Sequence, residues 1–260
     1  MKTVILCGGY GTRIRDVADD IPKPMIPVGR FPILWHIMKY YACFGHKDFV
    51  LCLGYKSQAI KDFFLNYEAH IKDFTVDLGG KTPIRFHTDH SESDWRVTLA
   101  ETGLNAMTGA RIRRIRKYVG DDENFMLTYG DGVGNVDLDR LLAFHNTHGK
   151  TLTVTGVRPP GRFGELLNDA GGNVTEFNEK PQATAGRISG GFFICRRNVF
   201  DYLEDREDLV FEKEPMTKLV KDRQLMMYEH DGFWQPMDTH REYQLLNGLY
   251  DRGEAPWVKW

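Results

Sequence analysis

Leu6-Cys7-Gly8-Gly9-Tyr10-Gly11-Thr12-Arg13-Ile14-Arg15 ends an apolar run and places three glycines within four residues. Glycine has no Cβ and tolerates positive φ, so this loop can bend sharply and bring its backbone close to a ligand. Exposed N–H groups of such a turn suit anionic oxygens. The Walker pattern Gly-x-x-x-x-Gly-Lys-Ser/Thr is absent. The dinucleotide fingerprint is also incomplete, because Ile14 stands where its third small residue is needed after Gly9 and Gly11. We interpret the stretch as a triphosphate-binding loop, with a plain strand-to-helix turn as the alternative.

A stiff segment with three prolines, 21–27, lies a few residues further along. Proline fixes its own φ and biases the preceding residue toward extended geometry, so Pro22 and Pro24 hold Lys23 on a rigid backbone. Rigid presentation of one cation is useful where a phosphate must be positioned. We interpret Lys23 as a phosphate ligand, with a turn-rich connector as the alternative.

Outside these loops the chain alternates between short apolar runs and amphipathic stretches. Continuous apolar runs, typical of strands buried on both faces, occupy 3–7, 49–53, 125–129 and 152–157. Apolar positions at helical spacing occupy 33–44, 57–67, 108–119 and 137–148. This alternation predicts an α/β fold with a mostly parallel sheet flanked by helices. A more antiparallel region is expected around 174–177, and 188–195 is expected to form one strand entered through two glycines.

Composition limits the classes of protein. The chain has 260 residues, 27% of them charged, and a net charge of −2, which argues against bulk binding to nucleic acid or to an anionic membrane. No run has the length of a spanning helix and the N-terminus lacks a signal-peptide pattern, so we expect a cytoplasmic protein in one domain, 1–260. The cysteines are predicted to be reduced core thiols; they are Cys7, Cys43, Cys52 and Cys195.

Two aspartates and one arginine complete the candidate site. Asp131 follows the apolar run 125–129, and a carboxylate just past a strand's carboxyl end lies where ligands bind in an α/β sheet. Asp238 precedes Thr239, which forms a capping box with Glu242, so Asp238 is either a spare capping group or a second metal ligand. Magnesium takes one or two protein carboxylates and fills its other positions with phosphate oxygens and water.

Arg111 stands near the start of the helix predicted to begin at Thr108. A cation there opposes the helix dipole, so a ligand or an acidic partner would help to explain it. The other basic residues of 113–117 are interpreted as a solvated face. The chain shows no strong nucleophile–base pair, which suits phosphoryl or nucleotidyl transfer, where the protein mainly positions groups and stabilises charge.

Gly8-Gly9-x-Gly11-Thr12-Arg13 with Pro22-Lys23-Pro24-Met25 resembles the signature of the sugar-1-phosphate nucleotidylyltransferases. Tyr129-Gly130-Asp131 and Glu179-Lys180-Pro181 resemble later motifs of that family, in the same order. Further segments resemble the cytidylyl branch of the family, which acts on glucose 1-phosphate: Thr102-Gly103, Thr108-Gly109-x-Arg111, 159–164, Gly190-Gly191-Phe192-Phe193, 233–239 and Ala255-Pro256-Trp257. The resemblance covers nearly the whole chain.

The resemblance implies a Rossmann-like sheet, with a mainly nucleotide-binding half (1–150) and a mainly sugar-binding half (151–260). It implies the transfer of a cytidylyl group from CTP to α-D-glucose 1-phosphate with Mg²⁺, in a homo-oligomer for which a hexamer is one form. The residues implied to act in catalysis are Arg13, Lys23, Asp131 and Lys180. Those implied to bind the nucleotide are Leu6, Gly8, Gly9, Gly11, Thr12, Arg13, Lys23, Thr102, Gly103, Arg111 and Gly130, with Arg111 and 102–103 near the cytosine. Those implied to bind the sugar phosphate are Gly164, Glu179, Lys180, Ser189, Gly190 and Trp234, and the implied metal ligands are Asp131 and Asp238.

Some features leave alternatives open. Ser189 stands where the family pattern leads us to expect Asn, which bears on the sugar. The same chemistry with dTTP, UTP or another sugar 1-phosphate is the nearest alternative. A glycosyltransferase that consumes a nucleotide sugar should show an Asp-x-Asp at a strand end, and Asp137-Leu138-Asp139 has that spacing but begins a helix. A non-catalytic sensor of nucleotide sugars is disfavoured, because four residues implied to act in catalysis or metal binding are intact: Lys23, Asp131, Lys180 and Asp238.

Overall fold

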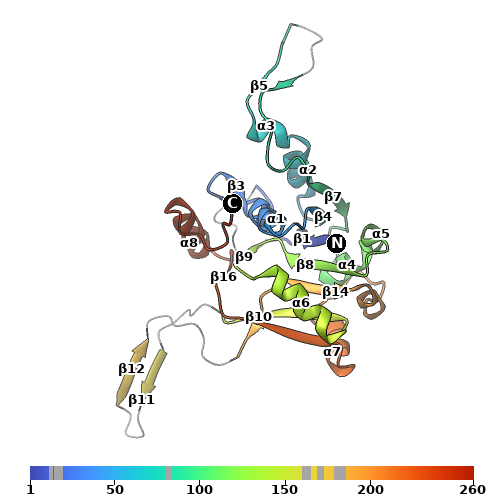
Figure 1. The fold of residues 1–260 in the computed structure, drawn as a ribbon, viewed down its shortest axis with the longest axis vertical. Coiled ribbons are helices and arrows are strands. Elements are labelled where there is room, and N and C mark those ends of the chain that lie inside the picture. Colours follow the sequence, from blue (N-terminus) through green and yellow to red (C-terminus); the bar gives the residue numbers. More distant parts are fainter. Residues whose placement is uncertain (12–13, 15–19, 80–83, 160–164, 169–172, 179–185) are drawn as a thin grey trace.

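The computed structural model describes residues 1–11, 14, 20–79, 84–159, 165–168, 173–178 and 186–260. Its centre is a mixed sheet, drawn in Figure 1. The strands of this sheet are β1 (Thr3–Leu6), β4 (Asp48–Leu53), β7 (Arg96–Glu101), β8 (Asn124–Tyr129), β10 (Leu152–Val157), β13 (Ile188–Ser189), β14 (Phe193–Arg196) and β15 (Leu225–His230). They follow the order β13-β10-β14-β8-β1-β4-β7, and β15 pairs with β10.

The first half of the sheet is parallel, as the alternating pattern predicts. Strand β1 runs parallel to both β4 and β8, and β4 runs parallel to β7. Strand β14 then pairs antiparallel with both β8 and β10, while β15 runs parallel to β10. The expected strands at the four continuous apolar runs are confirmed, and the carboxyl ends of β1 and β8 lie side by side at Leu6 and Tyr129.

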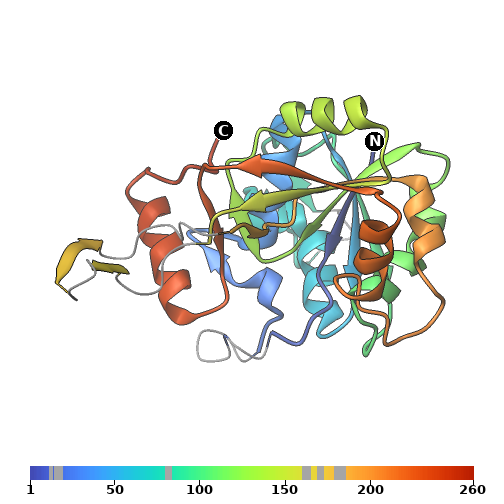
Figure 2. The ribbon, with the colours of Figure 1, turned by 90° about the horizontal axis from the view of Figure 1, so that it is seen from below.

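Helices cover both faces of this sheet. They are α1 (Ile33–Cys43), α2 (Ser57–Leu65), α3 (Tyr67–Ile71), α4 (Thr108–Arg114), α5 (Arg116–Val119), α6 (Leu138–His148), α7 (Glu214–Lys221) and α8 (His240–Asp251), with short 3₁₀ helices η2 (Lys23–Met25) and η3 (Arg197–Tyr202). Successive strand residues point to opposite faces, so Ile5 packs in the cluster with α1 and α6 and Val4 in the cluster with α4 and α7. Figure 2 shows α6 and α7 on opposite sides of the strands.

Three predicted elements are interrupted. The helix expected over 57–67 divides at Asn66, whose side-chain amide donates to the carbonyl of Asp62 and competes with the backbone ladder. The helix expected over 108–119 divides at Ile115, where the backbone leaves helical geometry (φ −91°, ψ 1°). The single strand expected over 188–195 is wrong, because positive φ at Gly191 (75°) and Phe192 (47°) separates β13 from β14.

Four short antiparallel pairs complete the architecture. They are β2 (Pro27–Val28) with β3 (Phe31–Pro32), β5 (Phe74–Thr75) with β6 (Arg85–Phe86), β9 (Gly132–Gly134) with β16 (Trp234–Pro236), and β11 (Glu165–Asn168) with β12 (Val174–Asn178). In Figure 1, β5 and the β11–β12 pair lie at opposite ends of the molecule, away from the central sheet. The pair β11–β12 confirms the expected antiparallel region.

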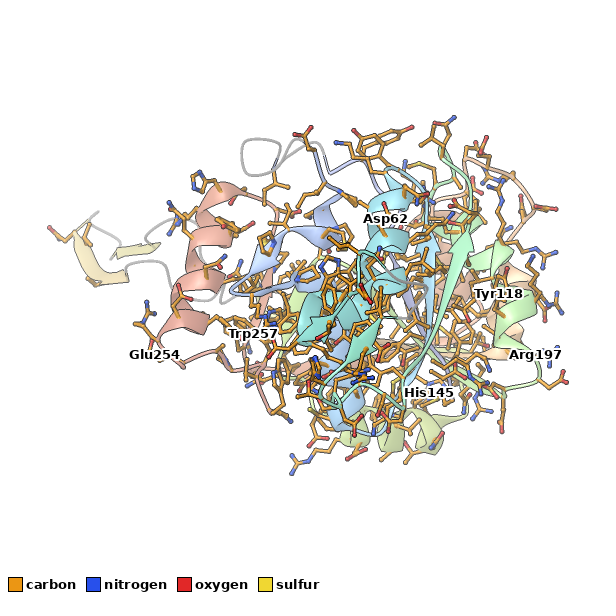
Figure 3. The ribbon with its side chains drawn as sticks, turned by 90° about the horizontal axis from the view of Figure 1, so that it is seen from above. Asp62, Tyr118, His145, Arg197, Glu254 and Trp257 are labelled. Atoms are coloured by element: carbon orange, nitrogen blue, oxygen red, sulfur yellow. The ribbon has the colours of Figure 1, made fainter. Side chains whose placement is uncertain are left out.

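The C-terminal segment packs back onto the body. Trp257, labelled in Figure 3, is 1% exposed and stacks on Phe233 at 5.7 Å between ring centroids. Its indole N–H donates to the Nδ1 atom of buried His36 on α1. Three of the cysteines are buried thiols as expected, but Cys43 is exposed because it ends α1 at the surface. Within the described ranges no helix has the length and apolar character to cross a bilayer.

Candidate active site

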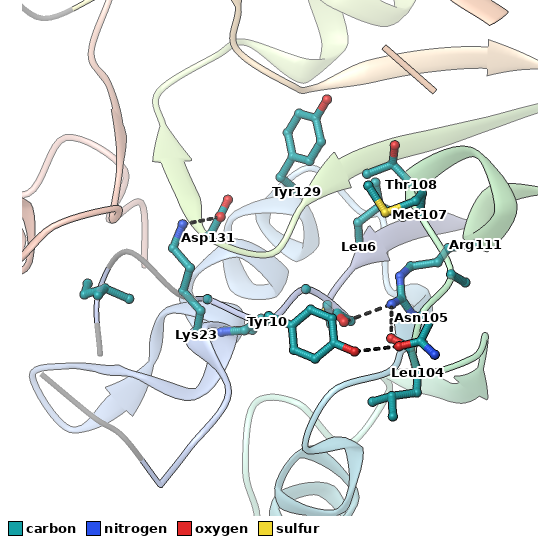
Figure 4. Close-up of a pocket in the computed structure, with 17 residues that line it drawn as sticks. Leu6, Tyr10, Lys23, Leu104, Asn105, Met107, Thr108, Arg111, Tyr129 and Asp131 are labelled. Atoms are coloured by element: carbon teal, nitrogen blue, oxygen red, sulfur yellow. Dashed lines mark hydrogen bonds and ion pairs between the residues drawn. The ribbon is translucent and has the colours of Figure 1, made fainter. Parts of the chain in front are cut away.

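A pocket of about 350 Å³ opens at the carboxyl ends of β1 and β8, where ligands bind in open α/β sheets (Figure 4). Its volume lies in the range of small-molecule sites. The glycine loop 8–11 forms one wall, and 104–108 forms another. Lys23 and Asp131 lie at one end of it, and Arg111 lies at the other, as Figure 4 shows.

Lys23 joins two carboxylates at its end of the pocket. Its Nζ lies 2.5 Å from Oδ2 of Asp131 and also donates to Oδ1 of Asp238. The Lys23 side chain is only 10% exposed. Burial lowers its pKa, but the two carboxylates raise it, and the net pKa is raised from the ordinary value. Lys23 is therefore a fully charged ammonium group between two acidic side chains.

The pairing of β9 with β16 explains why Asp131 and Asp238 meet although they lie far apart in the sequence. Gly132 pairs with Pro236 in this ladder, and the backbone N–H of Met237 donates to the Asp131 carbonyl at 2.8 Å. Asp131 lies one residue before Gly132, and Asp238 lies two residues after Pro236. Glu242 then fixes the second one, because its Oε2 accepts from the backbone N–H groups of Asp238 (2.6 Å) and Thr239 (2.9 Å). The predicted capping box of Thr239 and Glu242 is confirmed.

These two carboxylates fit a small divalent cation. Carboxylate oxygens are hard ligands, and a cationic group, the Lys23 ammonium, already lies between them. Among the described residues no group of three or more His, Cys, Asp and Glu side chains gathers to hold a metal. Two carboxylates suffice for Mg²⁺ only where substrate phosphates and water supply its other ligands.

Arg111, on α4, is buried at the other end of the pocket. Its Nη1 donates to the carbonyls of Leu53 (2.8 Å) and Gly103 (2.8 Å) and to the hydroxyl of Thr102 (2.9 Å). Its Nη2 donates to the carbonyl of Gly8 at 2.9 Å. Burial lowers the pKa of its guanidinium from the ordinary value. The sequence predicted a ligand or an acidic partner for Arg111, and the structure shows neutral oxygens around it instead. Through these bonds Arg111 connects the ends of β4 and β7 to the glycine loop.

The packing of Arg111 also accounts for two glycines. A Cβ placed on Gly8 would lie 2.2 Å from Nη1 of Arg111, and one placed on Gly54 would lie 2.4 Å from the same atom. Gly11 has a φ of 61°, and a Cβ there would lie 3.1 Å from Cβ of Lys23. Apart from its chain neighbours, no described residue has an atom within 4 Å of the Gly9 Cβ position, and Gly9 lines the pocket. The glycine loop therefore directly contacts Lys23 and Arg111, the two cationic side chains among the described lining residues.

Three residues implied to bind the nucleotide lie behind the pocket wall. Thr102 is 1% exposed and its hydroxyl donates to the Leu53 carbonyl at 2.6 Å. Gly103 accepts from Arg111 through its carbonyl. Gly130 donates to the Leu6 carbonyl at 3.0 Å and packs against the end of β1. Leu6 itself lines the pocket.

The structure brings three of the residues implied for the sugar close to one another. The indole N–H of Trp234 donates to the Gly190 carbonyl at 2.8 Å, and the hydroxyl of Ser189 accepts from the Gly191 N–H at 3.5 Å. Trp234 belongs to β16 and pairs with Gly134 of β9, the strand that follows Asp131. A Cβ on Gly190 would lie 2.5 Å from Val157, which accounts for the close backbone approach that the two glycines suggest. The other predicted site residues fall outside the described residues: Thr12, Arg13, Gly164, Glu179 and Lys180.

Sequence reasoning missed several lining residues. The Tyr10 hydroxyl donates to Oδ1 of Asn105 at 2.6 Å and links the glycine loop to the segment before α4 (Figure 4). The carboxylate of Glu212 accepts from Tyr129 at 2.5 Å and from Thr108 at 2.6 Å. Tyr10 stands at the unspecified position of the glycine loop, and Thr108 and Tyr129 belong to motifs quoted above. Asn105 carries no motif, and neither does Glu212, which contacts the lining from outside it.

The family follows from comparison with known proteins. A family model described as nucleotidyl transferase matches residues 2–248, and the chain belongs to that family. It is 46% identical over 261 residues to a glucose-1-phosphate cytidylyltransferase of Salmonella typhi, covering all of both chains. A probable glucose-1-phosphate cytidylyltransferase of Bacillus subtilis is 42% identical, again over the full length of both. Among solved structures, HddC from Yersinia pseudotuberculosis complexed with GMP-PN has a TM-score of 0.68 at 22% identity, covering 96% of this chain and 99% of that one.

Proposed function

We propose that the protein transfers a cytidylyl group from CTP to α-D-glucose 1-phosphate and releases CDP-glucose and pyrophosphate. Full-length identity of 46% to a glucose-1-phosphate cytidylyltransferase carries this proposal. The geometry of the pocket supports it, because a glycine loop, a buried lysine and two carboxylates converge at the carboxyl end of the sheet.

The reaction is a displacement at the α-phosphorus of the nucleotide. An oxygen of the sugar phosphate forms the new P–O bond, and the bond to the β-phosphate oxygen breaks with its electron pair on pyrophosphate. The nucleophile is already an anion, so no protein base is required. Lys23 lies beside the glycine loop and neutralises charge that develops on the transferred group.

Asp131 and Asp238 are the residues that would hold Mg²⁺. When bound, the ion supplies charge neutralisation and orientation of the phosphate oxygens. Glu242 keeps the Asp238 backbone in place, and the β9–β16 ladder brings the Asp238 segment to Asp131, which lines the pocket.

The remaining roles rest on the motif resemblance. Arg13 is proposed to contact the leaving pyrophosphate, Lys180 the phosphate of the sugar and Glu179 its hydroxyl groups. Gly164 and Gly190 are proposed to line the sugar site. Arg111 is proposed to act near the cytosine, and its contacts with Gly8, Gly103 and Thr102 support an action through the pocket wall. We also propose that the enzyme is a cytoplasmic homo-oligomer, which size-exclusion chromatography with light scattering tests.

A turnover panel tests the function. The purified protein is given CTP, dTTP, UTP, GTP or ATP with Mg²⁺ and one of several sugar 1-phosphates, and released pyrophosphate is measured. We expect the highest kcat/KM with CTP and glucose 1-phosphate. Preference for dTTP or UTP would overturn the proposed specificity for CTP, and preference for another sugar phosphate would overturn the proposed specificity for glucose 1-phosphate. No turnover with any pair would overturn the proposed reaction.

A further inference from the structure

The ammonium group of Lys23 lies within reach of three anionic groups: the carboxylates of Asp131 and Asp238, and a triphosphate bound on the glycine loop. Lys23 contacts both Asp131 and Asp238, and its backbone also packs against Gly11 of the glycine loop. A triphosphate on that loop would lie within reach of the four-carbon stem of Lys23. An ammonium held between two carboxylates cannot at the same time neutralise that triphosphate.

The backbone around Lys23 is fixed, so only its side chain is free to change partner. The 3₁₀ turn is closed by the N–H of Met25 on the Pro22 carbonyl (2.8 Å) and by the N–H of Ile26 on the Lys23 carbonyl (3.1 Å). Prolines on both sides of Lys23 restrict φ further. The two carboxylates are fixed as well, by the β9–β16 ladder and the capping box. Two carboxylates held at one Nζ atom favour a cation between them, either Lys23 or another.

We propose that Lys23 and a divalent cation exclude one another between Asp131 and Asp238. This inference rests on the proposed function, which supplies both the metal and the triphosphate. In the free protein Lys23 occupies the space and weakens metal binding. Metal binding releases the ammonium toward the glycine loop, where it meets the phosphates. By reciprocity, a triphosphate that draws Lys23 away raises the affinity for the metal, so metal and nucleotide bind cooperatively.

Metal titration of the free, full-length protein tests the exclusion. Mn²⁺ alone is added without nucleotide, and unbound Mn²⁺ is followed by electron paramagnetic resonance. We expect Lys23→Met to bind Mn²⁺ at least about tenfold more tightly than the wild type, because the ammonium no longer competes for two nearby charges. Lys23→Arg, which keeps the charge, should bind like the wild type. Equal affinity of Lys23→Met and the wild type would overturn the proposal.

Two further variants locate the effect. Adding Asp131→Asn and Asp238→Asn to Lys23→Met should abolish the gain, and a gain that survives would place the metal elsewhere and overturn the proposal. Lys39→Met is the matched control, because Lys39 also forms a buried ion pair, with Glu92, but lies outside the pocket.

Thermal unfolding gives a second readout that does not depend on a tight metal complex. Saturating Mg²⁺ should raise the Tm of Lys23→Met more than that of the wild type or of Lys39→Met, since Mg²⁺ neutralises two carboxylates that have lost their lysine. The same rise in all three proteins would overturn the exclusion. This outcome is separable from failure of the reaction: normal turnover with equal metal affinity removes the exclusion alone, whereas a metal gain without any turnover keeps the exclusion and removes the reaction.

Discussion

The two ends of the pocket hold their cations in opposite ways. Arg111 is surrounded by backbone carbonyls and a hydroxyl, and no described acidic side chain forms an ion pair with it. The Nζ atom of Lys23 is instead held by two carboxylates, those of Asp131 and Asp238. Backbone carbonyls are neutral and fixed by the fold, so they do not attract a second cation in place of Arg111. Carboxylates are anionic and can bind another cation in place of Lys23. We therefore propose that Arg111 maintains the shape of the pocket and that Lys23 supplies charge to the reaction.

The largest expected effect separates the two ends by activity. Lys23→Ala should lower kcat/KM for CTP by about 10³-fold, because one preorganised cation is lost from the transferred phosphoryl group. Pyrophosphate release measures it. Lys39→Ala removes a buried lysine outside the pocket and should leave kcat/KM within a few-fold of wild type. Near-normal kcat/KM for Lys23→Ala would contradict its role in the reaction.

The next effect separates the ends by stability. Arg111→Met should lower the free energy of unfolding by about 3 kcal/mol, since the carbonyls of Gly8, Leu53 and Gly103 lose a buried donor. Urea unfolding followed by circular dichroism measures it. Arg113→Met, on the same helix but away from the pocket lining, is the matched control and should change stability by less than about 0.5 kcal/mol. A stability loss below about 1 kcal/mol for Arg111→Met would show that the guanidinium does not hold the frame.

A double-mutant cycle sharpens the link between Arg111 and the glycine loop. Gly8→Ala should cost about 2 kcal/mol of stability, because its methyl group meets the guanidinium. In an Arg111→Ala background the same change should cost about 1 kcal/mol less, because the obstacle is gone. Gly9→Ala, whose Cβ position is open, should be nearly neutral in both backgrounds. If the losses of unfolding free energy from Gly8→Ala and Arg111→Ala simply add, the contact between the two residues does not contribute to stability.

The smallest effect concerns the link between the glycine loop and the segment before α4. Tyr10→Phe removes the hydroxyl that donates to Asn105, a bond on exposed side chains. We expect KM for CTP to change by less than about threefold, and kcat to stay the same, since exposed hydrogen bonds contribute little. Steady-state kinetics measures both constants. A large fall in kcat would mean that Tyr10 takes part in the reaction itself.

Much of the frame was predictable because its signals are local. The strands at 3–6, 48–53, 124–129 and 152–157 are continuous apolar runs, and the helix after Thr239 has its own capping residues. Lys23 and Asp131 were found from proline stiffening and from position at a strand end, and the structure places both in one pocket.

The rest depended on contacts between distant segments. Nothing local marks 132–134 or 234–236 as partners, yet their pairing brings Asp131 and Asp238 together. The environment of Arg111 was equally hidden, since the sequence shows a cation near a helix start but not the carbonyls that surround it. Phe192 breaks an otherwise plausible strand with a left-handed backbone that its residue type does not announce.

The β9–β16 ladder also sets an order of events during folding. Gly132 and Pro236 are joined only after nearly the whole chain has emerged from the ribosome, so the acidic pair is among the last features that a nascent chain can complete. Until then, Asp131 is the only one of the two carboxylates that Lys23 can contact. A contact between residues so far apart in the sequence forms slowly, because the chain loses conformational entropy in closing the long loop before the contact stabilises it. During refolding, enzyme activity should therefore return later than the circular dichroism signal of the helices that cover the sheet.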